Sequence, residues 1–254
     1  MTQLHGLVTL VTGGSRGLGR ATALAFAREG AAVIVCAREA SDLRATENEL
    51  ASLDAPVLAL AADVRSPRDI ERVVALGFAR FARIDVLVNN ASELGPTPLP
   101  YLADFPPADF VDVLAVDLIA PFRLTQAVIG DMLRRGRGVI VNISSDVAVT
   151  GYAGWGAYAI SKAGLDAMTR TWAAELSGTG VRIYALDPGD MDTAMHRAAL
   201  PDDDPATLLD PATVAPALVD LVAGDLDVPS GARVRAADLL ATRSSRTHAV
   251  ESLR

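Results

Sequence analysis

Short apolar runs rich in β-branched residues recur along the chain, and longer stretches with helical spacing separate them. In each run the residues on both alternating faces are apolar, which is typical of strands in a parallel sheet covered by helices on both sides. The runs are Leu7–Val11, Ala32–Cys36, Val57–Ala61, Ile84–Val88, Gly138–Ile143 and Val181–Leu186, with a weaker candidate at Ala232–Ala236. The pattern therefore predicts a buried parallel sheet.

The stretches between the strands have the length and the apolar spacing of helices. They are Arg20–Glu29, Ser41–Ala51, Arg68–Arg80, Phe110–Arg134 and Ala157–Leu176. Gly30 and Gly178 stand near two of their ends, where helices favour glycine. Regular alternation of strand and helix predicts an α/β fold with an open, doubly wound sheet and right-handed crossovers.

One segment, Met191–Thr213, interrupts this alternation with many Asp, Pro and Ala residues, and we expect it to form a loop or short helices over a site. The polar tail from about residue 242 is expected to be frayed. The sequence shows no internal repeat, low-complexity linker or domain boundary.

Composition narrows the class of protein. The chain has 254 residues, of which 50% are hydrophobic and 21% are charged, which suits one large globular domain or two small ones. A chain of this length buries roughly three quarters of its unfolded surface, so folding needs no disulfide. With Cys36 as the single cysteine and only three histidines, we expect no intramolecular disulfide, no usual zinc site and a reducing compartment.

The net charge of −8 bears on possible partners. A surplus of dispersed acidic side chains argues against binding to nucleic acid or to an anionic membrane. The N-terminal sequence lacks a secretion signal, and the sequence suggests no apolar segment of the roughly 20 residues needed to cross a bilayer. We therefore expect a soluble protein of the cytoplasm.

A glycine-rich run follows the first predicted strand and precedes the first predicted helix, the setting in which such a run binds a dinucleotide. It reads Thr12-Gly13-Gly14-Ser15-Arg16-Gly17-Leu18-Gly19. Gly13 allows the sharp turn, Gly17 lets the backbone approach a diphosphate, and Gly19 lets the helix pack closely on the strand. The helix N-terminus adds free N–H groups and the positive end of its dipole. The plain alternative is a tight turn without a ligand.

Two arginines bear on the choice of cofactor. Arg38 follows the second strand, next to Ala37, which stands where an NAD-preferring enzyme commonly carries a carboxylate for the ribose 2′-hydroxyl. Arg16 in the glycine loop can reach the same place, and guanidinium groups suit bidentate contacts with phosphate. The two arginines favour NADP(H) over NAD(H), unless both are ordinary surface charges.

Tyr158 and Lys162 are four residues apart on a predicted helix, so they share one face of it, and Ser145 closes the fifth strand. An ammonium group in a partly dry cleft favours the phenolate, so we expect Lys162 to lower the pKa of Tyr158 from its usual value of ~10. Tyr158 can then exchange a proton with a substrate oxygen that the Ser145 hydroxyl holds.

These motifs occur in an order that resembles the short-chain dehydrogenase/reductase family, in its single-domain branch, from Leu7 to about Thr193. The resemblance rests on the glycine loop, Asp63-Val64, Asn89-Asn90-Ala91, Ser145, Tyr158 with Lys162, and Pro188-Gly189 followed by Thr193. It implies one NAD(P)-binding Rossmann domain over residues 1–254, a three-layer structure in which helices cover both faces of a parallel sheet of about seven strands.

The resemblance also implies roles for single residues. Asp63, with Val64 beside it, would contact adenine, and Asn89 and Ala91 would line the cofactor groove. Lys162 would hold the nicotinamide ribose. The residues that would contact the rest of the cofactor are Gly13, Ser15, Arg16, Gly17, Leu18, Gly19, Arg38, Tyr158, Pro188, Gly189 and, at the nicotinamide carboxamide, Thr193. Members of the family are commonly dimers or tetramers, so the resemblance implies a homodimer or homotetramer packed through Phe110–Arg134 and Tyr158–Leu176.

Three departures from the family pattern stand out. Asp117 replaces an Asn that is thought to position a water molecule in the proton relay, and its carboxylate could pair with Lys162 or shift the titration of the relay, which makes it a candidate catalytic residue. Ser92 replaces a Gly, which a negative φ would tolerate. The Asp-Gly-Gly ending that many relatives place after the last strand is missing, and Pro229-Ser230-Gly231 precedes that strand instead.

The leading hypothesis is an NADP(H)-dependent oxidoreductase that reduces a carbonyl group, or oxidises the corresponding secondary alcohol, of a small and partly apolar substrate. The alternative is an NADP(H)-binding regulatory or non-redox protein in which Asp117 alters the relay. An epimerase or dehydratase can use the same Tyr and Lys, although such relatives are typically longer. Tyr152, Trp155, Met191 and Met195 are the candidates for substrate contact.

Overall fold

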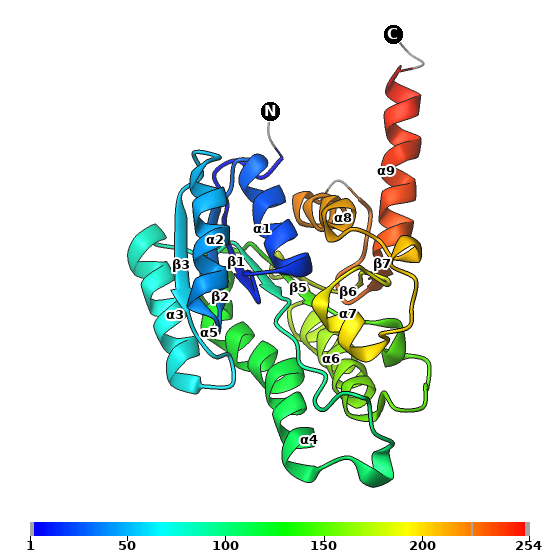
Figure 1. Ribbon diagram of the computed structural model, residues 1–254. Coiled ribbons are helices and arrows are strands. Elements are labelled where there is room, and N and C mark those ends of the chain that lie inside the picture. The colour runs from blue at the N-terminus through cyan, green and yellow to red at the C-terminus, as the bar shows by residue number, and fades with distance from the viewer. Residues whose placement is uncertain (1–2, 225, 252–254) are drawn as a thin grey trace.

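The computed structural model describes residues 3–224 and 226–251 and confirms the predicted α/β fold. Seven parallel strands form one sheet in the order β3-β2-β1-β4-β5-β6-β7, and helices cover both of its faces (Figure 1). The strands are β1 (Val8–Thr12), β2 (Ala32–Ala37), β3 (Val57–Ala61), β4 (Val86–Asn89), β5 (Gly138–Ile143), β6 (Val181–Asp187) and β7 (Arg233–Arg235). The strand order reverses between β1 and β4, and open α/β sheets bind ligands at the carboxyl edge of this switch point.

The helices divide between two faces of the sheet. They are α1 (Gly17–Arg28), α2 (Ala40–Ala51), α3 (Pro67–Phe81), α4 (Pro107–Leu114), α5 (Ala120–Arg135), α6 (Gly156–Glu175), α7 (Ala194–Ala199), α8 (Pro211–Ala223) and α9 (Ala236–Glu251), with single turns η1 (Leu102–Asp104), η2 (Ala115–Ile119), η3 (Asp146–Ala148) and η4 (Pro205–Thr207). One core cluster contains side chains of α1, α2, α8 and α9, and a second contains side chains of α3, α5 and α6. The sheet therefore lies between two apolar layers, as the two-sided apolar strands require.

The predicted strands and helices begin and end close to where the sequence places them, but three features differ. The single helix predicted over Phe110–Arg134 contains a π-helical turn, η2, between α4 and α5. The segment 191–213 carries α7 and η4, and helix α8, which the sequence did not predict, begins at Pro211. Helix α9 continues through Glu251 where the sequence predicts a frayed tail, and residues 252–254 lie outside the described part of the chain.

The helical stretch Pro107–Arg135 is long and apolar enough, by length and composition, to cross a membrane, contrary to the expectation from the sequence. Half of its most apolar window is buried inside the protein, where Leu124 and Val128 belong to the core cluster under the sheet. This burial is the arrangement of a core helix.

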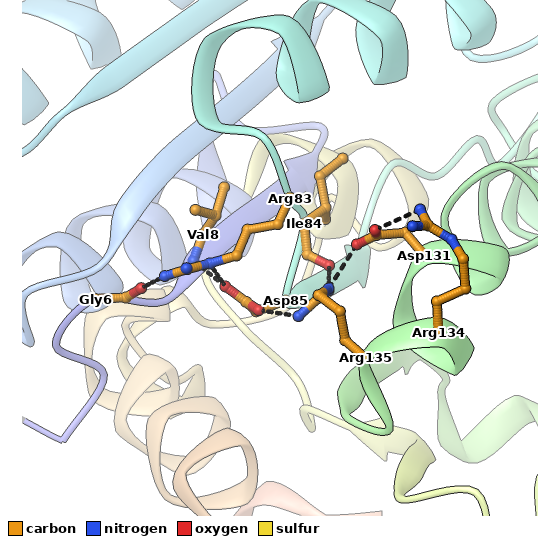
Figure 2. A network of polar contacts seen from close by, with 8 residues as sticks. All are labelled: Gly6, Val8, Arg83, Ile84, Asp85, Asp131, Arg134 and Arg135. Carbon is orange, nitrogen blue, oxygen red and sulfur yellow. Dashed lines mark hydrogen bonds and ion pairs between the residues drawn. The ribbon is translucent and has the colours of Figure 1, made fainter.

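A network of charged side chains ties α5 to the amino-terminal edge of the sheet, opposite the carboxyl edge (Figure 2). The Asp85 carboxylate is buried and accepts hydrogen bonds from the Val8 N–H at 2.9 Å, Arg83 Nε at 2.9 Å and Arg135 Nη1 at 2.5 Å. Arg135 also donates to the Ile84 carbonyl and to Asp131. Asp85 thus anchors the start of β1 and the C-terminus of α5 together.

We expect Asp85→Asn to lower the free energy of unfolding by about 2 kcal/mol, because a neutral amide weakens charge-assisted bonds to two arginines. The network lies at the edge opposite the glycine loop, so cofactor affinity should not change. Urea denaturation of this variant beside Asp42→Asn, an exposed carboxylate of α2, measures the effect. A loss below about 0.5 kcal/mol would mean that the network behaves as an ordinary surface ion pair.

Candidate active site

The glycine loop between β1 and α1 has the backbone geometry that the sequence predicts. Gly13 and Gly17 have φ values of 65° and 54°, in the region that favours glycine. A Cβ atom on Gly19 would collide with the Gly13 carbonyl oxygen and the Asn90 side chain, so only glycine allows this close approach. The first turn of α1 has neither a side-chain cap nor an acidic residue. Its N–H groups therefore remain available to an anion, and the loop fits a diphosphate.

Thr12 and Asn90 hold the glycine loop to the end of β4. Thr12 Oγ1 accepts hydrogen bonds from the N–H groups of Asn90 and Ala91, both at 3.0 Å, and the Asn90 amide donates to the carbonyls of Thr12 and Gly13. Asn89, predicted to line the groove, is buried and donates to Asn142 Oδ1 of β5 at 2.8 Å. Asn90, which the sequence did not single out, therefore shapes this edge of the site, whereas Asn89 joins two strands.

At the carboxyl ends of β2 and β3, the predicted adenosine end of the site, Arg38 and Asp63 each have a neighbour of opposite charge. Arg38 Nη1 forms an ion pair with Glu93 at 3.1 Å, and Arg65 binds the Asp63 carboxylate at 2.7 Å. Hydrogen bonds from Arg65 lower the pKa of Asp63. Arg16 is exposed at the N-terminus of α1, and the apolar Val64 is buried. Arg38 and Arg16 thus lie on neighbouring segments. Arg38 is half-exposed and forms its ion pair with Glu93.

Tyr158, Lys162 and Ser145 come together at the carboxyl ends of β5 and β6. Lys162 is 2% exposed, its Nζ donates to the Ile143 carbonyl at 2.9 Å, and it lies 5.2 Å from the centre of the Tyr158 ring. Ser145 is the last residue before η3, and its Oγ donates to Asp146 at 3.0 Å. The predicted pairing of Tyr158 and Lys162 on one face of α6 is therefore present.

The pKa of Tyr158 shifts in the direction opposite to the prediction. Burial is the largest cause and raises the pKa of Tyr158, and the Asp117 carboxylate raises this pKa further. The nearby Ser92 and Ser145 hydroxyls lower it by a smaller amount. Burial also lowers the pKa of Lys162, although Asp117 and Asp166 counteract this change. The expected effect of the ammonium is outweighed by the desolvation of the phenol and by the nearby Asp117 carboxylate, neither of which the sequence indicated. Tyr158 is therefore neutral at physiological pH in the free protein.

Asp117 lies in the π-helical turn η2 and is fully buried. Its carboxylate accepts hydrogen bonds from the Glu93 N–H at 2.8 Å and from Ser161 Oγ at 3.2 Å. Burial raises the pKa of Asp117 to about 6, and Lys162 counteracts part of this rise. No ion pair joins the Asp117 carboxylate to Lys162 among the described residues. Of the two outcomes considered from the sequence, a direct pair and a shifted titration, the structure shows the second.

Ser92 and Ser161 are site residues that the sequence reasoning missed. The backbone of Ser92 is not left-handed, so a serine can replace glycine at this position without strain. The Ser92 hydroxyl lowers the pKa of both Asp117 and Tyr158. Ser161 Oγ bonds the Tyr158 carbonyl at 2.7 Å as well as Asp117. Ser92 follows the Asn-Asn-Ala motif directly and Ser161 precedes Lys162, so their positions were the available signal.

The turn after β6 approaches the glycine loop. The Gly189 N–H donates to Asp187 Oδ1 at 3.1 Å, within a turn that follows Pro188. Thr193 caps α7 by accepting the His196 N–H at 3.1 Å, and its Cγ2 lies 3.4 Å from where a Cβ atom on Gly17 would stand. Thr193 and the start of α1 are thus neighbours, as binding to one cofactor requires.

The four candidates for substrate contact fall in different settings. Trp155 lies beside Tyr158, with their ring centres 5.8 Å apart, and Tyr152 is 47% exposed. Met191 packs against the core and forms an isolated β-bridge with Leu209, which holds the segment after β6 in place. Met195 is half-buried on α7. Trp155 is therefore the candidate that packs against the ring of Tyr158.

Comparison with known proteins agrees with this geometry. The sequence profile of the family described as short chain dehydrogenase matches residues 7–204. The 3-oxoacyl-acyl-carrier-protein reductase FabG of Thermotoga maritima is 39% identical over 193 residues, which cover 76% of this chain and 77% of that protein.

Solved structures are similar over nearly the whole chain. A short chain dehydrogenase from Pseudomonas syringae superposes with a TM-score of 0.87 at 33% identity, covering 92% of this chain and 96% of that chain. A short chain dehydrogenase from Shigella flexneri, complexed with NADP, gives a TM-score of 0.85 at 30% identity, covering 92% of this chain and 98% of that chain.

Proposed function

Because this chain belongs to the short-chain dehydrogenase family, we propose that it is an NADP(H)-dependent carbonyl reductase acting on a small, partly apolar substrate. The observation that carries the proposal is the neutral Tyr158 beside Ser145 and Lys162. A reduction needs a proton donor at the carbonyl oxygen, and the Tyr158 phenol carries its proton at neutral pH. Its raised pKa makes it a weaker acid, so the transfer depends on Lys162 to stabilise the phenolate and on Ser145 to bind the substrate oxygen. The reductase among its relatives supports the same direction of reaction.

In the proposed reaction, Tyr158 and Ser145 act on one oxygen atom of the substrate, and Lys162 acts on Tyr158. Tyr158 donates its phenolic proton to the carbonyl oxygen as negative charge develops there, and the Ser145 hydroxyl donates a hydrogen bond to the same oxygen. Lys162 stabilises the phenolate left after the transfer, since its Nζ lies over the Tyr158 ring. The nicotinamide cofactor supplies the hydride when it is bound.

The preference for NADP(H) is proposed from Arg38 and Arg16. Both stand near the carboxyl end of β2 and the glycine loop, and no carboxylate occupies position 37. Arg38 is held by Glu93, a pair that a 2′-phosphate would replace with a stronger bidentate contact. The Shigella flexneri relative, whose structure contains NADP, supports the proposal.

We expect Arg38→Ala to raise the Kd for NADPH about tenfold and to leave the Kd for NADH unchanged, because only the 2′-phosphate needs the guanidinium. Cofactor fluorescence titrations of the variant measure both constants, with Arg44→Ala on the exposed side of α2 as the matched control. Equal losses of affinity for NADPH and NADH would show that Arg38 does not bind the 2′-phosphate.

Reductase activity is tested by following NADPH oxidation with a panel of aliphatic and aromatic ketones and 3-oxoacyl thioesters. Turnover of at least one of them supports the proposal. The alternative, an NADP(H)-binding protein without redox turnover, rests on Asp117, because its carboxylate disfavours the phenolate that any proton transfer must form. Tight NADPH binding without reduction of any carbonyl would favour that alternative.

We also propose a homo-oligomer of the cytoplasm. Apolar side chains are exposed on the helices through which relatives were expected to pack, and they are Val111, Ile119, Phe122, Leu133 and Ile160. An exposed apolar surface is typical of a protein interface. Burial raises the pKa of the Cys36 thiol to about 12, so the single cysteine is unreactive, which suits a reducing compartment.

A further inference from the structure

Arg233 lies in β7, at the edge of the sheet beyond the catalytic strands, and its side chain points into the protein, where it is 21% exposed. Its Nη2 donates to the Ser145 carbonyl at 2.8 Å and to Asp187 Oδ2 at 2.9 Å. Its Nε lies 3.2 Å from Asp166 Oδ2. One guanidinium group therefore contacts residues at the ends of β5 and β6 and a residue of α6, three neighbouring elements in Figure 1.

Two of these contacts reach segments that the proposed reaction uses. The Ser145 carbonyl that Arg233 binds also accepts a hydrogen bond from the Ala148 N–H at 3.1 Å, the bond that closes the turn η3. Arg233 therefore helps to hold the backbone of Ser145, from which the Ser145 hydroxyl projects. Asp187 accepts Arg233 through one oxygen and the Gly189 N–H through the other. Arg233 is thus connected through Asp187 to the Pro188–Gly189 turn.

The third contact reaches the catalytic helix. Tyr158, Lys162 and Asp166 follow one another at intervals of four residues, so they lie along one face of α6. Asp166 is 4% exposed; burial raises its pKa, and the Ser144 hydroxyl, Arg233 and Lys162 counteract part of this rise. Arg233 therefore fixes α6 relative to the two strand ends through a buried ion pair.

We propose that Arg233 is a positioning residue that holds Ser145, the Pro188–Gly189 turn and the catalytic face of α6 in one geometry. The inference rests on the proposed function, because these segments matter together only if Ser145 and Tyr158 act on one oxygen. The planar guanidinium is suited to this role, since its Nη2 donates to two acceptors while its Nε stands against the Asp166 carboxylate at a fixed angle, whereas an ammonium is a single point charge.

A role limited to stability would give a different outcome. A buried cation that only neutralised Asp166 and Asp187 would be replaced by any cation of similar length, and its loss would loosen the whole fold. A positioning residue instead requires the guanidinium geometry, and its loss changes the local order of Ser145 and Asp187 and lowers kcat more than it raises KM.

The test compares Arg233→Gln and Arg233→Lys with Arg235→Gln. Arg235 lies two residues further along β7, is 64% exposed and forms an ion pair with Asp238, so it is the matched control. Amide hydrogen exchange is followed at Ala148 and Gly189, the two N–H groups bonded to the partners of Arg233. Melting temperature, NADPH affinity, kcat and KM are measured on the same samples.

We expect exchange at these two amides to be at least tenfold faster in Arg233→Gln, and kcat to fall about tenfold with little change in KM. Arg233→Lys should recover the melting temperature but keep the fast exchange and the low kcat. Arg235→Gln should match the wild type.

Wild-type exchange and kcat in a folded Arg233→Gln would overturn the proposal, and so would complete recovery of both by Arg233→Lys. If Arg233→Gln does not fold, Arg233→Lys alone decides between the two roles. A wild-type protein that reduces no carbonyl would contradict the proposed function, whereas the exchange of Ala148 and Gly189 tests the positioning role independently of any substrate.

Discussion

Replacing Tyr158 with Phe is expected to lower kcat for carbonyl reduction by about 10³-fold and to leave the Kd for NADPH within about twofold. The substitution removes only the hydroxyl, and the ring can keep its contacts with Trp155 and Lys162. No other group is proposed to donate the proton to the carbonyl oxygen. The fall in kcat therefore corresponds to the full rate contribution of the general acid rather than to weaker binding of substrate or cofactor.

The matched control for this variant is Tyr101→Phe, which removes the hydroxyl of a tyrosine that is 66% exposed and lies outside the site. Steady-state kinetics of both variants with a ketone from the panel, together with NADPH fluorescence titrations, separate chemistry from binding. Undiminished kcat in Tyr158→Phe would remove Tyr158 from the reaction, and a parallel loss of NADPH affinity would point to a role in binding the cofactor.

Much of the fold follows from local patterns that the chain repeats. A strand that is apolar on both faces has to lie between two layers of helices, and each such run, from Leu7–Val11 to Val181–Leu186, overlaps a strand of the central sheet. Gly13, Gly17 and Gly19 predict the glycine loop, because the backbone geometry at these positions excludes a side chain. The spacing of Tyr158 and Lys162 places both on one face of a helix before any tertiary contact is known.

What the sequence did not provide depends on contacts between distant segments. Arg233 meets the Ser145 carbonyl across 88 positions, and Asp117 meets Ser161 across 44, so no local pattern indicates either contact. The direction of the pKa shift of Tyr158 depends on burial and on Asp117, both of which arise from packing. Helix α8 was missed because Pro216 stands inside it, although Asp210 caps its first turn and Pro211 begins it.

Asp117 has a measurable consequence for stability, because its pKa differs between the folded and the unfolded chain. Burial raises the pKa from the ordinary 3.8 to about 6, so the folded protein holds this proton more tightly than the unfolded chain does. The group therefore stabilises the fold fully below pH 4, and this contribution is lost as the pH rises from about 4 to about 6. Across this interval the loss amounts to about 3 kcal/mol.

Replacing Asp117 with Asn removes this titration while the amide oxygen can still accept the Glu93 N–H. We expect the free energy of unfolding of Asp117→Asn, minus that of the wild type, to increase by about 3 kcal/mol between pH 4 and pH 7 and to stay constant above that. Urea denaturation at intervals across this range measures the difference. Asp112→Asn, whose carboxylate is 56% exposed on the preceding helix α4, should show no such change. A difference between Asp117→Asn and wild type that is independent of pH would mean that Asp117 titrates alike in both states and that burial does not raise its pKa in the folded protein.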